Sequence, residues 1–132
     1  MSNIRILVAG TFDFFHKGHQ KFLLDAQKLG DDLCVIIARD ANVQKIKGFL
    51  PTESEDIRKK NIENFNPEIS VFLGDLHDFL KIPLELNPDI IALGYDQHVP
   101  EKFHSIFLEK KTQIIRLQAF KPEEFKSSFF RK

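Results

Sequence analysis

Short apolar runs alternate along this chain with stretches of helical periodicity, and this alternation limits its possible folds more than any other feature. It is typical of repeated strand–helix–strand units, which build a parallel sheet. Residues 33–38 (LCVIIA) are continuously apolar, as in a strand covered on both faces. We therefore expect an α/β fold, a doubly wound parallel sheet of about five strands with helices on both faces. The expected strands are residues 4–8, 33–38, 69–73, 90–93 and 114–117.

Capping and proline signals place the helices between these strands. Thr52, with Glu55 three residues later, predicts a capping box that opens a helix at residues 52–65. Pro83 should break or kink a helix at residues 78–86. The other expected helices are one that follows the first strand and ends at Gly30, and one at residues 100–111.

Composition excludes several function classes. The chain has 132 residues, which predicts one domain at residues 1–132. Lys plus Arg and Asp plus Glu number 19 each, so no overall field favours nucleic acid or an anionic membrane. The single Cys34 cannot form an internal disulfide, and no stretch approaches transmembrane length. We expect a cytoplasmic protein with neither a nucleic-acid nor a membrane partner.

The turn after the first strand, residues 9–20 (AGTFDFFHKGHQ), carries the strongest chemical signal. His16 and His19 are three residues apart, so in a first helical turn both imidazoles face the same side. Gly10 allows a tight turn beside a ligand, and Gly18 would let a bulky anion approach the backbone. Helix N-termini favour phosphate. Two imidazoles beside a helix N-terminus would therefore form a charge-stabilising site for a reacting phosphate. The alternative is a pair of helix-surface residues or an incidental metal pair.

Residues 10–19 resemble the GTFDxxHxGH signature of the cytidylyltransferase-like nucleotidylyltransferases. This resemblance implies a Rossmann-like fold and attack of a phosphorylated substrate on the α-phosphate of a nucleoside triphosphate, with pyrophosphate leaving. It implies a nucleotide site at Gly10, Thr11, Phe12, His16, Lys17, Gly18 and His19, with the two histidines catalytic.

A basic segment follows the second strand. Residues 42–48 read as a mobile basic loop, and the resemblance implies that Lys45, as a catalytic residue, and Lys47 hold phosphate or substrate there. It also implies that Asp40 lies near the acceptor substrate and that Arg58 faces the phosphates. Solvated surface charges are the alternative for these cations.

A second motif follows the fourth expected strand. Residues 88–97 (PDIIALGYDQ) resemble the matching stretch of archaeal-type FAD synthetases, that is, FMN adenylyltransferases. Gly94 would let a ligand rest on the backbone, and Asp96 can accept from ribose hydroxyls. The resemblance implies AMP transfer from ATP to FMN, giving FAD and pyrophosphate, with Mg²⁺ arriving on the triphosphate. It also implies a possible homodimer.

The tail departs from the pattern of these relatives. Ser127 and Ser128 could donate to phosphate oxygens at a helix N-terminus, or be ordinary helix caps. Phe120 falls where relatives place an aromatic near adenine, and core packing is the alternative. We expect no dedicated metal site, because His98 and His104 lack a helix-face spacing and a cysteine partner.

Two other functions stay open at this point. One is a cytidylyltransferase acting on glycerol 3-phosphate or a similar small phosphorylated alcohol. The other is a nucleotide-binding module without turnover, which only the altered tail favours.

Overall fold

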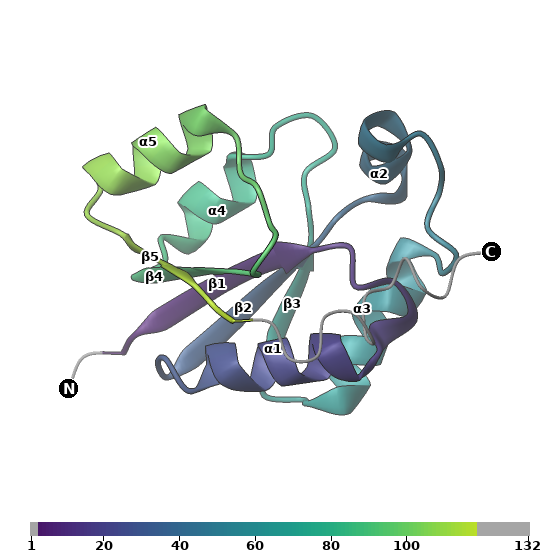
Figure 1. Ribbon diagram of the computed structural model, residues 1–132, viewed down its shortest axis with the longest axis horizontal. Coiled ribbons are helices and arrows are strands. Elements are labelled where there is room, and N and C mark those ends of the chain that lie inside the picture. Colours follow the sequence, from purple (N-terminus) through teal and green to yellow (C-terminus); the bar gives the residue numbers. More distant parts are fainter. Residues whose placement is uncertain (1–2, 119–132) are drawn as a thin grey trace.

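The computed structural model describes residues 3–118, which contain a single five-stranded parallel sheet (Figure 1). The strand order is β3-β2-β1-β4-β5, and every neighbouring pair is parallel. The predicted doubly wound α/β sheet is therefore confirmed. The strands are β1 (Arg5–Gly10), β2 (Asp32–Ile37), β3 (Ser70–Leu73), β4 (Ile90–Leu93) and β5 (Gln113–Arg116).

Helices cover both faces of this sheet. In Figure 1, α1 (Lys17–Gln27) and α3 (Glu55–Phe65) lie on one side, and α4 (Lys81–Leu86) and α5 (Glu101–Glu109) lie on the other. Alternate residues of β1 enter the two cores, since Ile6 and Val8 pack with α1 residues while Leu7 packs with Phe107 of α5. Burial of both faces explains the continuous apolar runs in the sequence.

Two predicted helix features are wrong in detail. Thr52 is not the cap of α3, because the helix begins at Glu55 and the Ser54 hydroxyl accepts from the Ile57 amide at 3.4 Å. Pro83 does not break its helix, because α4 begins only at Lys81 and so holds the proline in its first turn. A first-turn residue has no amide bond to lose within the helix, so the ring is tolerated there.

The predicted mobile loop at residues 42–48 is also wrong. Residues 40–47 form the helix α2 (Asp40–Lys47), which Gly48 ends at φ 85°. Lys45 and Lys47 lie in its last turn, where cations complement the helix dipole. Sequence periodicity missed this helix because Val43 is its only buried residue.

The sheet has its topological switch point between β1 and β4, where ligands bind in folds of this kind. β1 pairs with β2 up to Gly10 opposite Ile37, whereas its register with β4 ends at Leu7 opposite Ile91. The carboxyl ends of the two central strands are therefore not joined by strand pairing. In residues 3–118, no helix is both long and apolar enough to cross a membrane.

Candidate functional site

The two histidines of the first turn are stacked on one another. Their ring centroids are 3.7 Å apart with an interplanar angle of 20°. His16 is the N-cap of α1, and its Nδ1 accepts a hydrogen bond from the Gly18 amide at 3.1 Å. An Nδ1 that accepts carries no proton, so the neutral His16 ring holds its proton on Nε2 and can donate from that atom.

Burial disfavours the charged form of both imidazoles. Desolvation, and secondarily the neighbouring His16, lower the pKa of His19 from 6.5 to about 3. Desolvation also lowers the pKa of His16. Among the described residues, the buried Nδ1 atom of His19 has no hydrogen-bond partner. An anion bound here would favour the protonated rings and could supply that partner.

The backbone leading to the histidines is held in an uncommon conformation. Phe12, Phe14 and Phe15 have φ values of 55°, 65° and 29°, a region that L-residues rarely adopt. Strain of this kind persists where the surrounding structure fixes it, and it clusters at functional sites. The buried Asp13 carboxylate provides such a fixture, because it accepts from the amides of Thr52 at 2.8 Å and Glu53 at 3.0 Å.

Gly10 packs tightly against another side chain of the protein itself. A Cβ at this position would lie 3.0 Å from the ring of Phe12, closer than ordinary contact. From the sequence, Gly10 was predicted to leave room for a ligand beside the backbone. In the structure, the Phe12 ring already occupies that space, and it contacts His19 edge-on with ring centroids 5.3 Å apart.

Arg58 is completely buried, and its guanidinium forms hydrogen bonds with three segments around the site. Its Nη1 donates to the Thr11 carbonyl at 2.8 Å, and its Nε donates to the Glu53 carbonyl at 3.0 Å. Its Nη2 donates to Asp40 Oδ1 at 2.6 Å. All three nitrogens of the guanidinium are therefore engaged within the protein, which joins the first turn to the starts of α2 and α3.

A reciprocal pair of carboxylates joins these two helices. Glu55 Oε1 accepts from the Asp40 amide at 2.7 Å, and Asp40 Oδ2 accepts from the Glu55 amide at 3.2 Å. Glu55 also binds Arg39 at 3.0 Å, and Arg39 Nη1 reaches the Gly74 carbonyl at 3.2 Å. Each helix thus caps the other, and α2 is fixed at its amino end to the carboxyl edge of the sheet.

A cavity of about 410 Å³ opens at the same sheet edge, on the face covered by α4 and α5. Apolar strand residues that include Leu7, Ile36 and Leu93 line its base. Neither His16 nor His19 is among the described residues that line the cavity. Ala9 does line it, and the histidine turn follows Ala9 and Gly10 in the chain. The cavity therefore reaches the strand residue that precedes the histidine turn, at the carboxyl end of β1.

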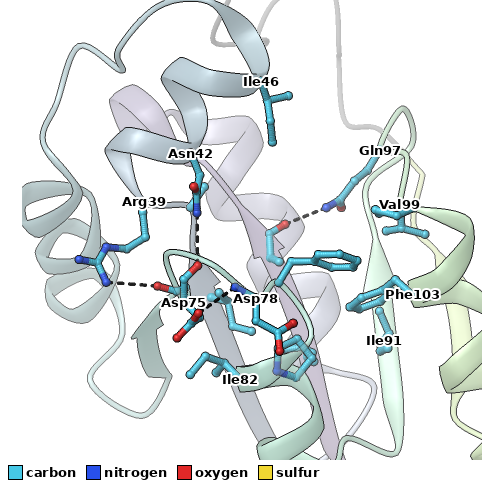
Figure 2. A pocket seen from close by; sticks show the side chains of 18 of the residues that line it. Arg39, Asn42, Ile46, Asp75, Asp78, Ile82, Ile91, Gln97, Val99 and Phe103 are labelled. Atoms are coloured by element: carbon cyan, nitrogen blue, oxygen red, sulfur yellow. Dashed lines mark hydrogen bonds between the residues drawn. The ribbon is translucent and has the colours of Figure 1, made fainter.

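Aromatic and aliphatic side chains form the walls of this cavity. Figure 2 shows Ile46 of α2 on one side, with Val99 and Phe103 on the other. Phe79 also lines the cavity and is 51% exposed, while Ile46 is 82% exposed. Such exposed apolar side chains around an opening are typical of a ligand site.

The structure brings only one of the two loop lysines to this cavity. Lys45 is among the lining residues, whereas Lys47 is exposed and lies outside the lining. Lys17 is exposed on the first turn of α1. Asp40 reaches the same sheet edge, but both of its carboxylate oxygens accept bonds within the protein.

The turn after β4 lies across the switch point from the histidine turn. Gly94 leaves open space, because a Cβ there would meet nothing closer than Gln97 at 3.9 Å. Asp96 is exposed on this turn. Room beside the backbone and an exposed carboxylate fit the approach of a ribose.

Most of the chain matches known proteins. The sequence profile described as cytidylyltransferase-like matches residues 7–132. The chain belongs to the cytidylyltransferase-like family. It is 44% identical over 129 residues to the FAD synthase of Archaeoglobus profundus, covering 95% of this chain and 81% of that protein. It is 41% identical over 128 residues to the FAD synthase of Ferroglobus placidus, covering 94% and 82%.

A solved structure shows the same fold. The lipopolysaccharide core biosynthesis protein from Thermoplasma volcanium is 34% identical, with a TM-score of 0.80 over 90% of this chain and 99% of that one. The family assignment and the parallel sheet were both predicted from the sequence, and both are confirmed.

Some predicted site residues lie elsewhere, and other contributing residues were missed. Phe120, Ser127 and Ser128 lie outside the described residues. Four residues hold site segments through hydrogen bonds but were not predicted as site residues from the sequence: Asp13, Glu55, Gln97 and Arg116. Asp13 and Gln97 fall inside the two motifs that carried the resemblance, so that signal was available. Nothing in the sequence marks Arg116.

Proposed function

We propose that this chain is an FMN adenylyltransferase, which transfers AMP from ATP to FMN to give FAD and pyrophosphate. The observation that carries the proposal is a pair of stacked histidines and a mainly apolar cavity at the same carboxyl edge of the sheet, in a chain similar to archaeal FAD synthases. A candidate phosphate site and a mainly apolar cavity at one sheet edge suit a substrate that has one phosphate and one flat ring system.

The cavity suits the flavin ring of the acceptor. Its volume of about 410 Å³ lies in the usual range for small-molecule sites. Ile46 and Phe79 would regain burial against the ring system, which offsets the cost of their exposure in the free protein. A small polar acceptor such as glycerol 3-phosphate has no ring with which to cover these side chains.

The nucleotide would lie across the switch point. Its α-phosphate would face His16 and His19, and its ribose would bind Asp96 beside Gly94. Lys45 and Lys47, in the last turn of α2, would neutralise the β- and γ-phosphates. Arg58 acts differently from the sequence expectation in this proposal, since its guanidinium holds Thr11 and Asp40 in place and does not touch phosphate.

The reaction needs no covalent enzyme intermediate. A phosphate oxygen of FMN attacks the α-phosphorus of ATP in line, a new P–O bond forms, and the bond to the bridging oxygen of pyrophosphate breaks. Catalysis then consists of positioning and charge stabilisation. The His16 Nε2–H donates toward the developing charge, and both rings gain protons more readily once the anion is bound.

Mg²⁺ would enter with ATP and neutralise charge on the phosphates when bound. Within residues 3–118, no group of three or more histidine, cysteine or carboxylate side chains could hold a metal ion. Such an ion would be held mostly by phosphate oxygens and water. The contribution of the chain is to orient those phosphates against the histidines.

A substrate matrix tests the proposal. Pyrophosphate release is measured with ATP or CTP, each paired with FMN, glycerol 3-phosphate or phosphoethanolamine. The proposal expects turnover with ATP and FMN, with FAD as the second product, and little with CTP and glycerol 3-phosphate. Robust turnover of CTP with a small acceptor, and none of ATP with FMN, would reverse the substrate assignment.

A further inference from the structure

The gap between β1 and β4 is bridged by one side chain. Strand pairing between them ends at Leu7 opposite Ile91, so the carbonyl of Ala9 has no partner in β4. The Gln97 side chain reaches across instead, and its Nε2 donates to the Ala9 carbonyl at 3.0 Å (Figure 2). Its Oε1 accepts from the Gly94 amide at 3.1 Å. One carboxamide thus joins the two central strands beyond the end of their ladder.

A second side chain holds the same turn from β5. Arg116 Nη1 donates to the carbonyls of Gly94 at 2.7 Å and Gln97 at 2.8 Å, with a longer contact of 3.4 Å to Tyr95. Arg116 is the last residue of β5 and pairs with Leu93. The segment 94–97 is therefore held by Gln97 toward β1 and by Arg116 toward β5.

We propose that Gln97 and Arg116 are positioning residues that fix the distance between the two halves of the nucleotide site. Gln97 ties the turn that bears Asp96 to the residue before Gly10, where the histidine turn begins. A nucleotide bound across the switch point spans both turns, so their separation decides where its α-phosphate lies relative to the histidines. The inference rests on the proposed function for the identity of the nucleotide.

The geometry predicts which kinetic constants respond. A shift of about 1 Å in a bound reactant can lower a rate by about a hundredfold. Arg116 is not among the described residues that line the cavity, so its loss should leave the acceptor site intact. Weaker ATP binding and slower turnover, with an unchanged KM for FMN, would mark a positioning role. A residue needed only for folding would lower the amount of active protein and leave both KM values unchanged.

The test compares Arg116→Met, Arg116→Lys and Gln97→Glu in the full chain. Arg116→Met should raise the KM and the Kd for ATP about tenfold, the scale for losing a hydrogen bond from a charged donor. Arg116→Lys should recover part of the loss, because an ammonium can still donate to these carbonyls. Gln97→Glu keeps the acceptor for Gly94 but cannot donate to Ala9, so it should also raise the KM for ATP.

Controls separate the possible failures. Gln113→Glu makes the same substitution at the exposed amino end of β5 and should leave the KM for ATP unchanged. Isothermal titration with ATP measures binding without an acceptor, so it tests the positioning role even if the wild-type chain forms no FAD. A wild-type chain that forms no FAD would instead count against the proposed function. Unchanged ATP affinity in folded Arg116→Lys and Gln97→Glu, or equal increases in the KM for ATP and for FMN in Arg116→Met, would overturn the inference.

Discussion

Replacing Arg58 with methionine should destabilise the protein strongly, because its guanidinium is completely buried and fully engaged. The substitution Arg58→Met preserves much of the side-chain volume but leaves the Asp40 carboxylate without its 2.6 Å partner. It also removes the donors to the carbonyls of Thr11 and Glu53. Breaking a buried ion pair by removing one partner costs about 3–5 kcal/mol, and the 30% exposure of the Asp40 side chain places this pair at the lower end of that range. Since domains are stable by only about 5–15 kcal/mol, the loss is large.

Urea unfolding followed by circular dichroism measures this difference directly. Lys59→Met is the matched control on the same helix, because Lys59 pairs with Glu63 at 3.3 Å on the surface. That control should change the free energy of unfolding by less than about 1 kcal/mol. An Arg58→Met variant that is as stable as wild type but binds ATP poorly would refute the reasoning, and would return Arg58 to the phosphates.

Three further predictions concern the histidine turn, the cavity and the tail. The pKa of His19 lies near 3, below the unfolded value, so the unfolded chain binds an extra proton and stability should fall as the pH drops from about 6.5 toward 3. Urea unfolding of His19→Asn at several pH values should show a smaller decrease in the free energy of unfolding as the pH falls. The same pH dependence as in the wild type would contradict burial of a neutral ring. Ile46→Ser should raise the KM for FMN about tenfold without changing the melting temperature, since Ile46 is 82% exposed. An unchanged KM for FMN would mean that the flavin ring does not bind in this cavity. Replacing both Ser127 and Ser128 with alanine should weaken ATP binding about threefold, the scale of one lost hydrogen bond, and unchanged affinity by titration would remove them from the site.

Periodicity predicted most of the fold because burial on both faces leaves a plain mark in the sequence. The strand at residues 90–93 has the same bounds in the structure, and all four of its residues are buried. Helix α2 was missed because one buried valine gives no periodic signal. The start of α3 was misplaced because Thr52 and Ser54 are both plausible caps, and only the tertiary contact of the Thr52 amide with Asp13 distinguishes them.

Spacing within a motif predicted the histidine pair, but not the contacts that hold the site in place. The interval between His16 and His19 predicted rings on one side, and the structure stacks them at 3.7 Å. Whether a charged residue faces a ligand or the protein depends on neighbours far along the chain. Arg58 illustrates this, because its partner Thr11 is 47 residues away. No local pattern reports such a contact.

The most direct test of the central claim is the rate of FAD formation by purified protein, followed by chromatography with saturating MgATP and FMN. The wild-type chain should form FAD and pyrophosphate in equal amounts. His16→Ala and His19→Ala should each lower kcat by about 10² to 10³, the scale for losing one charge-stabilising donor. Both variants should remain folded by circular dichroism. FAD formation at wild-type rates in either folded variant would contradict catalysis at the histidine turn.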